Sequence, residues 1–325
     1  MIQYQHLLKD ILAFGVEKRS GRANIPNTFG ISHATMKFNL QQGFPLLTTK
    51  KMYLKGVIHE LLWFLRGETN IKPLVDNNVN IWNKDAYRWY ETLSDIVEKE
   101  SGMKRAFNTE ESFVNAIKGT EPHFIYHVTN EGRQIHYTLG DLGRVYGYQW
   151  RNQNGVDQIK EVLKSLKENP DSRYHIIDGW NKADFKEMAL PPCHLLYQFI
   201  ARPKADLSNE YILDLNMYQR SCDTFLGVPF NISSMSLLLM IFAKASGMEP
   251  GTATWIGGDT HIYMDHKPMV ELQLSRNPYP LPKMEITKEL NSLEDILALK
   301  YEDFKLSDYQ HHPEIKAELF TGLKK

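Results

Sequence analysis

Apolar residues recur at the spacing of an α-helix in four segments, residues 7–15, 54–67, 159–172 and 231–247. The first two segments run to a glycine, which commonly ends a helix, and Pro170 closes the third. The third segment alternates apolar and charged residues and predicts an exposed amphipathic helix. The fourth is almost continuously apolar and predicts a buried core helix.

Two other segments predict paired strands. Residues 193–201 and 210–220 are rich in β-branched, aromatic and leucine residues, and a linker with Pro, Lys and Asn separates them. Helices and strands mix without regular alternation, which favours an α+β fold over a doubly wound sheet. Between about residues 87 and 136 the chain is polar and charged. We therefore expect one domain over residues 1–325, with a polar insertion at about 87–136 on its surface.

Composition and charge narrow the class of protein. The 325 residues are 42% hydrophobic and 11% aromatic, which is enough to bury a core and argues against disorder. Lys and Arg total 38 against 39 Asp and Glu, so no overall field favours nucleic acid or anionic lipid. Two cysteines are too few for a disulfide scaffold. The chain does not open with a signal-peptide pattern, and its longest apolar stretch is shorter than the roughly 20 residues that span a bilayer. We expect a soluble cytoplasmic protein that needs neither membrane nor nucleic acid.

Cys193 is the first candidate for chemistry. It follows two prolines and directly precedes His194. A lone cysteine is commonly a small buried hydrophobe. The alternative is a nucleophile, because the prolines and the following strand would hold its sulfur in place and nearby cations would favour the thiolate. These residues alone leave both interpretations open.

A second candidate lies between residues 218 and 231, which bring together a cation, a hydroxyl, a carboxylate, a glycine and an amide. These are Arg220, Ser221, Asp223, Gly227 and Asn231. Arg220 and Ser221 both donate hydrogen bonds and suit a phosphate. The Asn231 amide both donates and accepts, as does the amide edge of uracil or guanine. The alternative is a polar strand end with Asn231 as the N-cap of the next helix.

Two more segments carry titratable groups. Glu60 adjoins an apolar helical stripe, so its carboxylate lies either at a solvated edge or in a buried position with a raised pKa. Residues 257–266 include Asp259, His261, Asp265 and His266, which are possible metal ligands, but their spacing matches no common zinc motif, and we expect no metal. His261 and Tyr263, two residues apart, are alternatively expected on one face of a strand, where they would bind a sugar hydroxyl.

Several segments together closely resemble thymidylate synthase, the family of folate-dependent enzymes that methylate dUMP. They are FGISHATMKFNLQQGFPLLTTKK, HELLWFLRGETNI, GDLGRVYGYQWR, MALPPCH, YQRSCDTFLGVPFN, GGDTHIY, QLSRNPYPLPK and HPEIKA. The resemblance covers nearly the whole chain apart from the insertion, where the family varies in length. It implies a mixed β-sheet flanked by helices, with the sheet forming a homodimer interface.

The resemblance also implies a reaction. Cys193 would add to C6 of the uracil ring, and C5 would then attack the methylene carbon of 5,10-methylenetetrahydrofolate, the cosubstrate that also donates the hydride. Glu60 and Tyr146 would organise water for the proton transfers, and Arg220 would lie near the thiolate and the phosphate. The catalytic residues that it implies are Cys193, Glu60, Tyr146, Arg220 and Asp223.

Binding residues follow from the same resemblance. For dUMP it implies Arg19, Arg173, Gln219, Arg220, Ser221, Asp223, Asn231, His261 and Tyr263. Of these, Arg173 would come from the other subunit, and Asn231 would select uracil over cytosine. For the folate it implies Lys50, Tyr53, Trp82, Leu190, Asp223, Gly227, Phe230 and Phe320.

The chain departs from the family pattern at four places. Tyr174 stands where a second arginine is usual, which leaves His175 as a possible substitute. The segment RSGRANIPN replaces the usual phosphate loop, so that Arg19 or Arg22 would bind the phosphate. Tyr53 replaces a folate-contacting histidine and Asp85 a tryptophan near the pterin. The C-terminal tail is longer and ends in charged residues. Because that tail normally seals the site against water, a dUMP hydroxymethylase is the alternative activity. A nucleotide- or RNA-binding protein without activity and a metal-dependent phosphohydrolase are remoter alternatives.

Overall fold

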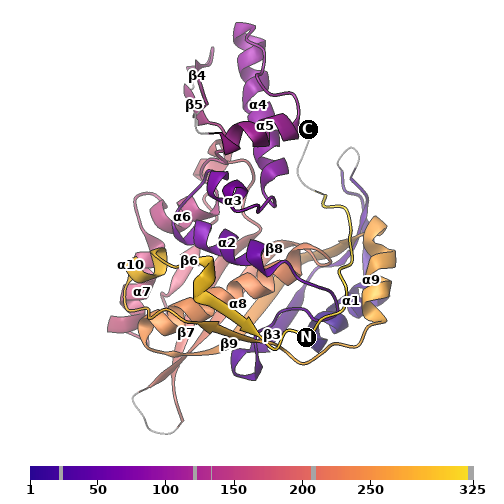
Figure 1. Cartoon of the computed structure of the whole chain (residues 1–325), viewed down its shortest axis with the longest axis vertical. Helices are drawn as coiled ribbons and strands as arrows, with labels where there is room; N and C mark the ends of the chain where they lie inside the picture. Colours follow the sequence, from indigo (N-terminus) through magenta and orange to yellow (C-terminus); the bar gives the residue numbers. More distant parts are fainter. Residues whose placement is uncertain (22–24, 120–122, 133, 206–209, 321–325) are drawn as a thin grey trace.

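A mixed β-sheet forms the centre of the computed structural model, which describes residues 1–21, 25–119, 123–132, 134–205 and 210–320 (Figure 1). Within these residues the sheet has seven strands in the order β1-β2-β9-β8-β7-β6, and β3 also pairs with β9. Its strands are β1 (Val16–Lys18), β2 (Thr28–Ile31), β3 (Ala34–Asn39), β6 (Ile176–Asp178), β7 (His194–Pro203), β8 (Tyr211–Asp223) and β9 (Glu249–Tyr263). The predicted strand pair is confirmed as β7 and β8, which run antiparallel, whereas β8 and β9 run parallel.

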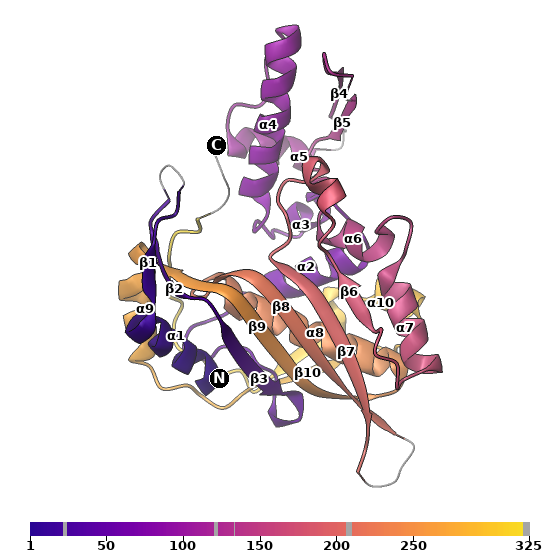
Figure 2. The ribbon, with the colours of Figure 1, turned by 180° about the vertical axis from the view of Figure 1, so that it is seen from behind.

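Helices cover one face of this sheet, and the opposite face is open in the view from behind (Figure 2). The α-helices are α1 (Ile2–Phe14), α2 (Leu54–Leu65), α3 (Lys72–Asp76), α4 (Asn83–Ser101), α5 (Glu110–Lys118), α6 (Tyr146–Asn152), α7 (Gln158–Glu168), α8 (Gly227–Ser246), α9 (Lys267–Leu274) and α10 (Leu293–Leu297). The 3-10 helices are η1 (Leu40–Gln42), η2 (Lys182–Glu187), η3 (Met264–His266) and η4 (Tyr301–Asp303). Outside the main sheet, β4 (Phe124–Val128) and β5 (Gln134–Thr138) form a hairpin, and β10 (Lys283–Ile286) and β11 (Phe304–Ser307) form a two-stranded antiparallel sheet. The α+β fold class is thereby confirmed.

The four helices predicted from periodicity are present as α1, α2, α7 and α8. Helix α8 begins at Gly227 rather than Asn231, so Asn231 lies within the helix and the N-cap interpretation is wrong. With 20 residues α8 is long enough to cross a membrane, contrary to the expectation from the apolar stretch alone. However, 72% of its most apolar window is buried inside the protein, as in the core helix of a soluble protein.

The segment expected to be a polar insertion is more structured than its composition suggested. Helices α4 and α5 and the hairpin β4–β5 project from the sheet and its covering helices (Figure 1). We call residues 83–138 the lobe. It has apolar residues of its own, since Tyr90, Phe113 and Tyr137 are almost fully buried and their rings lie against one another. The many charges hid this pattern, because in α4 they occupy the outer face of an amphipathic helix.

Candidate active site

The sheet topology brings the chemical segments to one edge. Cys193 immediately precedes β7, Asp223 ends β8, and Tyr263 ends β9. Because β7 runs antiparallel to β8 and β9 runs parallel to it, the start of β7 lies beside the ends of the other two strands. The register pairs His194 with Gln219 and Asp223 with His261. Residues 30 to 70 positions apart in sequence therefore become neighbours.

Cys193 is held from both sides. Its backbone N–H donates to the Tyr146 hydroxyl at 2.7 Å, and Nη2 of Arg220 lies 3.8 Å from its sulfur. Arg220 also donates from Nε to the Pro192 carbonyl (2.8 Å) and from Nη2 to the Pro191 carbonyl (2.9 Å). The two prolines thus serve as acceptors that fix the guanidinium beside the sulfur, where a cation stabilises negative charge. Cys193 is half-buried and forms no disulfide, an environment that favours the nucleophile over the inert core cysteine.

Glu60 lies in the second of the two environments expected for it, a largely buried position with a raised pKa. It lies on α2, and its carboxylate accepts a hydrogen bond of 2.8 Å from Trp82 Nε1. Although the side chain keeps some exposure, desolvation raises the pKa of Glu60 to about 7, against the opposing effect of the Trp82 hydrogen bond. The Trp82 ring lies 5.9 Å from that of Tyr146, which links Glu60 to the cysteine through contacting groups. A carboxyl group with this pKa can both take up and release protons near neutrality.

A chain of amides determines how Asn231 is oriented. The Trp255 indole N–H, which can only donate, bonds to Oε1 of Gln219 at 2.8 Å. Nε2 of Gln219 therefore faces Asn231 and donates to its Oδ1 at 3.0 Å. The Asn231 amide keeps both N–H donors and one oxygen lone pair for a ligand. That pattern matches the O4 acceptor and N3–H donor of uracil and mismatches cytosine.

The turn between β8 and α8 holds Asp223. Oδ1 of Asp223 accepts the backbone N–H groups of Phe225 (3.1 Å) and Leu226 (3.2 Å). No hydrogen bond from the described residues reaches the second oxygen, which can therefore accept one from a ligand. Lys50 is buried behind this turn and donates to the Phe225 carbonyl at 2.6 Å. Burial lowers the pKa of Lys50 to about 7, while the Asp223 charge raises it. Lys50 therefore supports the turn that carries Asp223.

The end of β1 and the last residues of β9 form the other side of the site. His261 Nδ1 lies 2.9 Å from Asp259 Oδ1, and Lys18 makes an ion pair with the same carboxylate. The hydrogen bond from His261 and the Lys18 charge hold the pKa of Asp259 well below its usual range. The Phe320 ring lies 4.8 Å from Tyr263, so the described part of the tail packs against this strand end. Among the described residues, no three His, Cys, Asp or Glu side chains are placed to hold one metal ion.

The other predicted residues differ in their exposure and in the elements that carry them. Arg19 and Arg173 are exposed on the described surface, and Arg22 lies outside the described residues. His175 is fully buried and bonded to Ser165 at 3.0 Å, so it does not replace the missing arginine. Tyr53 is 42% exposed. Ser221 lies in β8 opposite Asp259. Leu190 directly precedes the two prolines, Gly227 and Phe230 lie in the first turn of α8, and all three residues are half-buried.

Three residues of the site lay outside the predicted set. His194 is buried, its ring lies 4.5 Å from that of Tyr146, and burial lowers its pKa to about 4, which keeps it neutral. Trp180 lies under the Arg220 guanidinium at 5.5 Å. Trp255 orients Gln219 as described above. The position of His194 beside Cys193 was a signal in the sequence, whereas nothing local to Trp180 or Trp255 indicates their contacts.

Asp85, which stands where the family usually has a tryptophan, forms an ion pair that a tryptophan could not form. It is largely buried in the first turn of α4 and forms an ion pair of 2.6 Å with Arg88. Burial raises the pKa of Asp85, and the Arg88 charge opposes that effect. Both groups are therefore occupied with each other at the base of the lobe, one turn from Trp82.

Comparison with known proteins identifies the family of the chain. The family model described as thymidylate synthase matches residues 2–321. Curated relatives named thymidylate synthase include those of Mycoplasma mobile (43% identical, covering 98% of this chain and 99% of the relative) and Mycoplasma pneumoniae (41% identical, 98% and 99%). The thymidylate synthase of aster yellows witches'-broom phytoplasma is 42% identical over 95% of this chain and 98% of its own. The chain therefore belongs to the thymidylate synthase family of methyltransferases.

Proposed function

We propose that this chain converts dUMP to dTMP with 5,10-methylenetetrahydrofolate as donor of both the carbon and the hydride, and that Cys193 is its nucleophile. The observation that carries this proposal is the sulfur of Cys193 beside the Arg220 guanidinium, with the Cys193 N–H on Tyr146. Addition of a thiolate to C6 makes C5 nucleophilic and divides one difficult substitution into easier steps. The shared name of the relatives favours methylation over the hydroxymethylation that the tail suggested.

The remaining groups take complementary roles in this proposal. Glu60 and Tyr146 move protons at the uracil ring, since a carboxyl group with a pKa of about 7 is poised for both directions of transfer. Arg220 and Ser221 bind the phosphate together with Arg19. Asn231 and Gln219 read the base edge, and His261 and Tyr263 bind the ribose hydroxyl, on the strand end where His261 is fixed by Asp259.

The folate is a substrate of this proposed reaction, and the residues at the β8–α8 turn fit it. Asp223 has an open carboxylate oxygen that can accept N–H donors of a pterin. At Gly227 an added Cβ would lie 3.7 Å from both Asn231 Oδ1 and Asp223 Cβ, so glycine keeps free space beside both groups. The rings of Trp82, Phe230 and Phe320 and the side chain of Leu190 would pack around the cosubstrate. Lys50 acts through the turn, and Tyr53 lies at the exposed rim.

A homodimer formed through the open face of the sheet completes the proposed site. That face presents Leu196, Gln198, Ile200, Asn216 and Tyr218, of which Ile200 is 40% and Tyr218 39% exposed. The exposed Arg173 follows α7 and would reach the phosphate of the partner subunit. Members of the family are generally dimeric, and we place the enzyme in the cytoplasm.

One assay tests the proposed reaction. The protein is incubated with dUMP and methylenetetrahydrofolate, the pyrimidine product is identified by mass, and dihydrofolate is measured in parallel. We expect dTMP and dihydrofolate in equal amounts. A hydroxymethyl product with tetrahydrofolate retained would instead identify the hydroxymethylase, and activity lost to a chelator would favour metal chemistry.

Replacing Asn231 with aspartate should shift preference from dUMP towards dCMP. An ionised aspartate cannot donate to uracil O4, so we expect kcat/KM for dUMP to fall by about 10²-fold, the typical effect of an unmatched polar contact. The measurement is kcat/KM for both nucleotides in parallel. Asn231→Ala is the control, because it loses the contacts without gaining an acceptor. An unchanged preference in Asn231→Asp would refute the role of Asn231 in reading the base.

Arg173 is tested by mixing subunits. Arg173→Ala should weaken dUMP binding, and Cys193→Ala should remove the nucleophile. If Arg173 acts across the interface, a mixed dimer has one site with both residues intact, so co-expression should restore about a quarter of all sites. Recovery is measured as activity per total protein. No recovery, with mixed dimers verified by affinity tags, would place Arg173 within its own subunit.

A further inference from the structure

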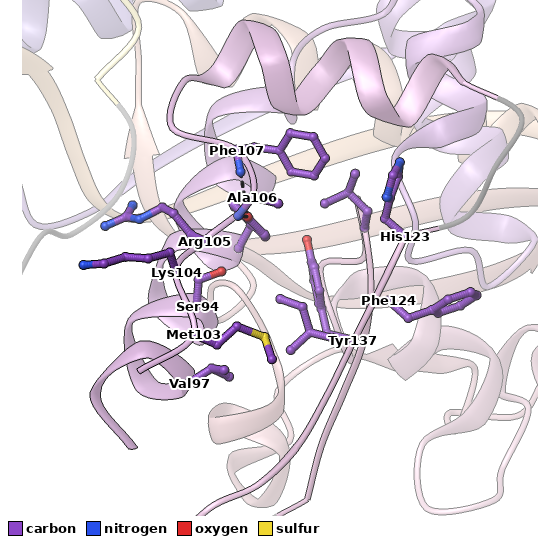
Figure 3. A pocket seen from close by; sticks show the side chains of 13 residues that line it. Ser94, Val97, Met103, Lys104, Arg105, Ala106, Phe107, His123, Phe124 and Tyr137 are labelled. Carbon is purple, nitrogen blue, oxygen red and sulfur yellow. Dashed lines mark hydrogen bonds between the residues drawn. The ribbon is translucent and has the colours of Figure 1, made fainter. Parts of the chain in front are cut away.

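The lobe contains a cavity of about 160 Å³, separate from the site around Cys193 (Figure 3). It lies between α4, residues 103–107 and the hairpin β4–β5. Its walls are mainly rings and aliphatic groups, contributed by Tyr90, Val97, Met103, Phe107, Tyr137 and Leu139. An apolar cavity of roughly 150 Å³ is large enough to take up benzene. The space thus suits a single ring.

The charged groups at the edge of this cavity are already paired. Arg105 forms ion pairs with Glu91 (2.8 Å) and Asp95 (2.9 Å), and Lys104 pairs with Glu98 at 2.5 Å. These cations are therefore balanced by local carboxylates and present no excess charge to a ligand. A neutral ligand suits the cavity better than an anion.

One polar group of the wall lacks a partner. The Ser94 hydroxyl on α4 is buried, and no hydrogen bond to it exists within the described part of the chain. Figure 3 shows this hydroxyl beside the cavity and directed towards the side of Tyr137. The hydroxyls of Tyr90 and Tyr137, in contrast, accept backbone N–H groups of Ala106 and Gly140. A buried hydroxyl without a partner is costly, and a polar atom of a ligand would satisfy it.

We propose that this cavity binds a small neutral aromatic molecule with one hydrogen-bonding group, of the chemical class of phenol. The ring would pack against Tyr90, Phe107 and Tyr137, and its polar atom would meet the Ser94 hydroxyl. The ring centroids already lie 5.9 Å (Tyr90 to Phe107) and 6.3 Å (Tyr90 to Tyr137) apart, within the separation at which aromatic rings attract one another. This site is additional to the proposed enzymatic activity and does not depend on it.

Calorimetric titration of the full chain, saturated with dUMP, with phenol and with benzene tests the proposal. Phenol should bind about three- to tenfold more tightly than benzene, which corresponds to one additional hydrogen bond. Ser94→Ala should remove this difference and keep benzene binding. Thr92→Ala, which removes an exposed hydroxyl from the same helix, should change neither.

Variants that fill the cavity test whether phenol and benzene bind there and not elsewhere on the protein. Val97→Phe should abolish binding of both ligands. If Val97→Phe does not fold, Val97→Leu is measured in its place and should weaken the binding of both ligands. Formation of dTMP by each variant verifies the rest of the fold. Equal affinity of the unmodified chain for phenol and benzene, the absence of binding, or binding that persists in both filled variants would each overturn the proposal.

Discussion

Replacing Cys193 with alanine should reduce turnover by at least about 10⁴-fold, the scale on which removal of a catalytic nucleophile acts. Without the sulfur, no covalent bond forms at C6 and C5 stays unreactive. The contacts of Arg220 to the two proline carbonyls persist, so the loop around position 193 should keep its shape. The initial rate of dihydrofolate formation at saturating dUMP measures the effect. Residual activity above about one hundredth would contradict the covalent mechanism.

Cys222 offers a matched control for this experiment. It lies in β8, three residues beyond Gln219, and is fully buried, with its sulfur donating to the Gln219 carbonyl at 3.3 Å. Burial raises the pKa of Cys222 to about 12, so its thiol stays protonated. Cys222→Ala should cost about 1–2 kcal/mol of stability through lost packing and leave turnover within a few fold. The contrast isolates the chemistry of Cys193 from the general cost of losing a thiol.

Replacing Glu60 with glutamine should lower turnover by about 10²- to 10⁴-fold, the usual contribution of a general acid or base. Glutamine keeps the shape and can still accept from Trp82, but it cannot exchange a proton. Since loss of the C5 proton requires the carboxylate, the rate of the unmodified enzyme should rise as pH increases through about 7, the pKa of Glu60. The pH–rate profile of Glu60→Gln should lack this rise. If the rise persists, another group is the base.

Stability gives an independent measurement of the same group. The pKa of Glu60 is about 7 in the folded state and 4.5 ordinarily. Between pH 4.5 and pH 7, therefore, Glu60 is protonated in the folded state and ionised in the unfolded chain. Folding stability therefore contains a favourable contribution at low pH that is lost as pH rises through this window. Glu60→Gln does not titrate, so its stability relative to the unmodified chain should increase from pH 5 to pH 8. Urea unfolding at both pH values tests this, and a constant difference would contradict the raised pKa.

Much of the fold was accessible from local patterns. Helix α2 and strands β7 and β8 were predicted close to their observed bounds, because apolar spacing and β-branched content act over a few residues. The lobe shows the limit of such reasoning. In α4 the buried Tyr90, Leu93 and Val97 form an apolar stripe, but the charges between them dominated the composition, and the segment was expected to be a polar insertion on the surface.

The candidate site divides in the same way. Its residue types were identified from short motifs and their resemblance to a family, which marked Cys193, Glu60 and Asn231. Their physical states depend on partners far along the chain. Glu60 has its raised pKa because it is desolvated beside Trp82, and Asn231 has its orientation because Trp255 donates to Gln219.

The sequence by itself determined four of the helices, the β7–β8 strand pair, the class of fold and the chemical groups, since these depend on neighbouring residues and on motifs read in order. Only the tertiary structure decided which of these groups meet. The antiparallel pairing of β7 with β8 and the parallel pairing of β8 with β9 place Cys193, Asp223 and His261 at one edge. Desolvation, hydrogen-bond direction and the pairing of charges arise from that packing, because each depends on atoms that approach only after the chain has folded.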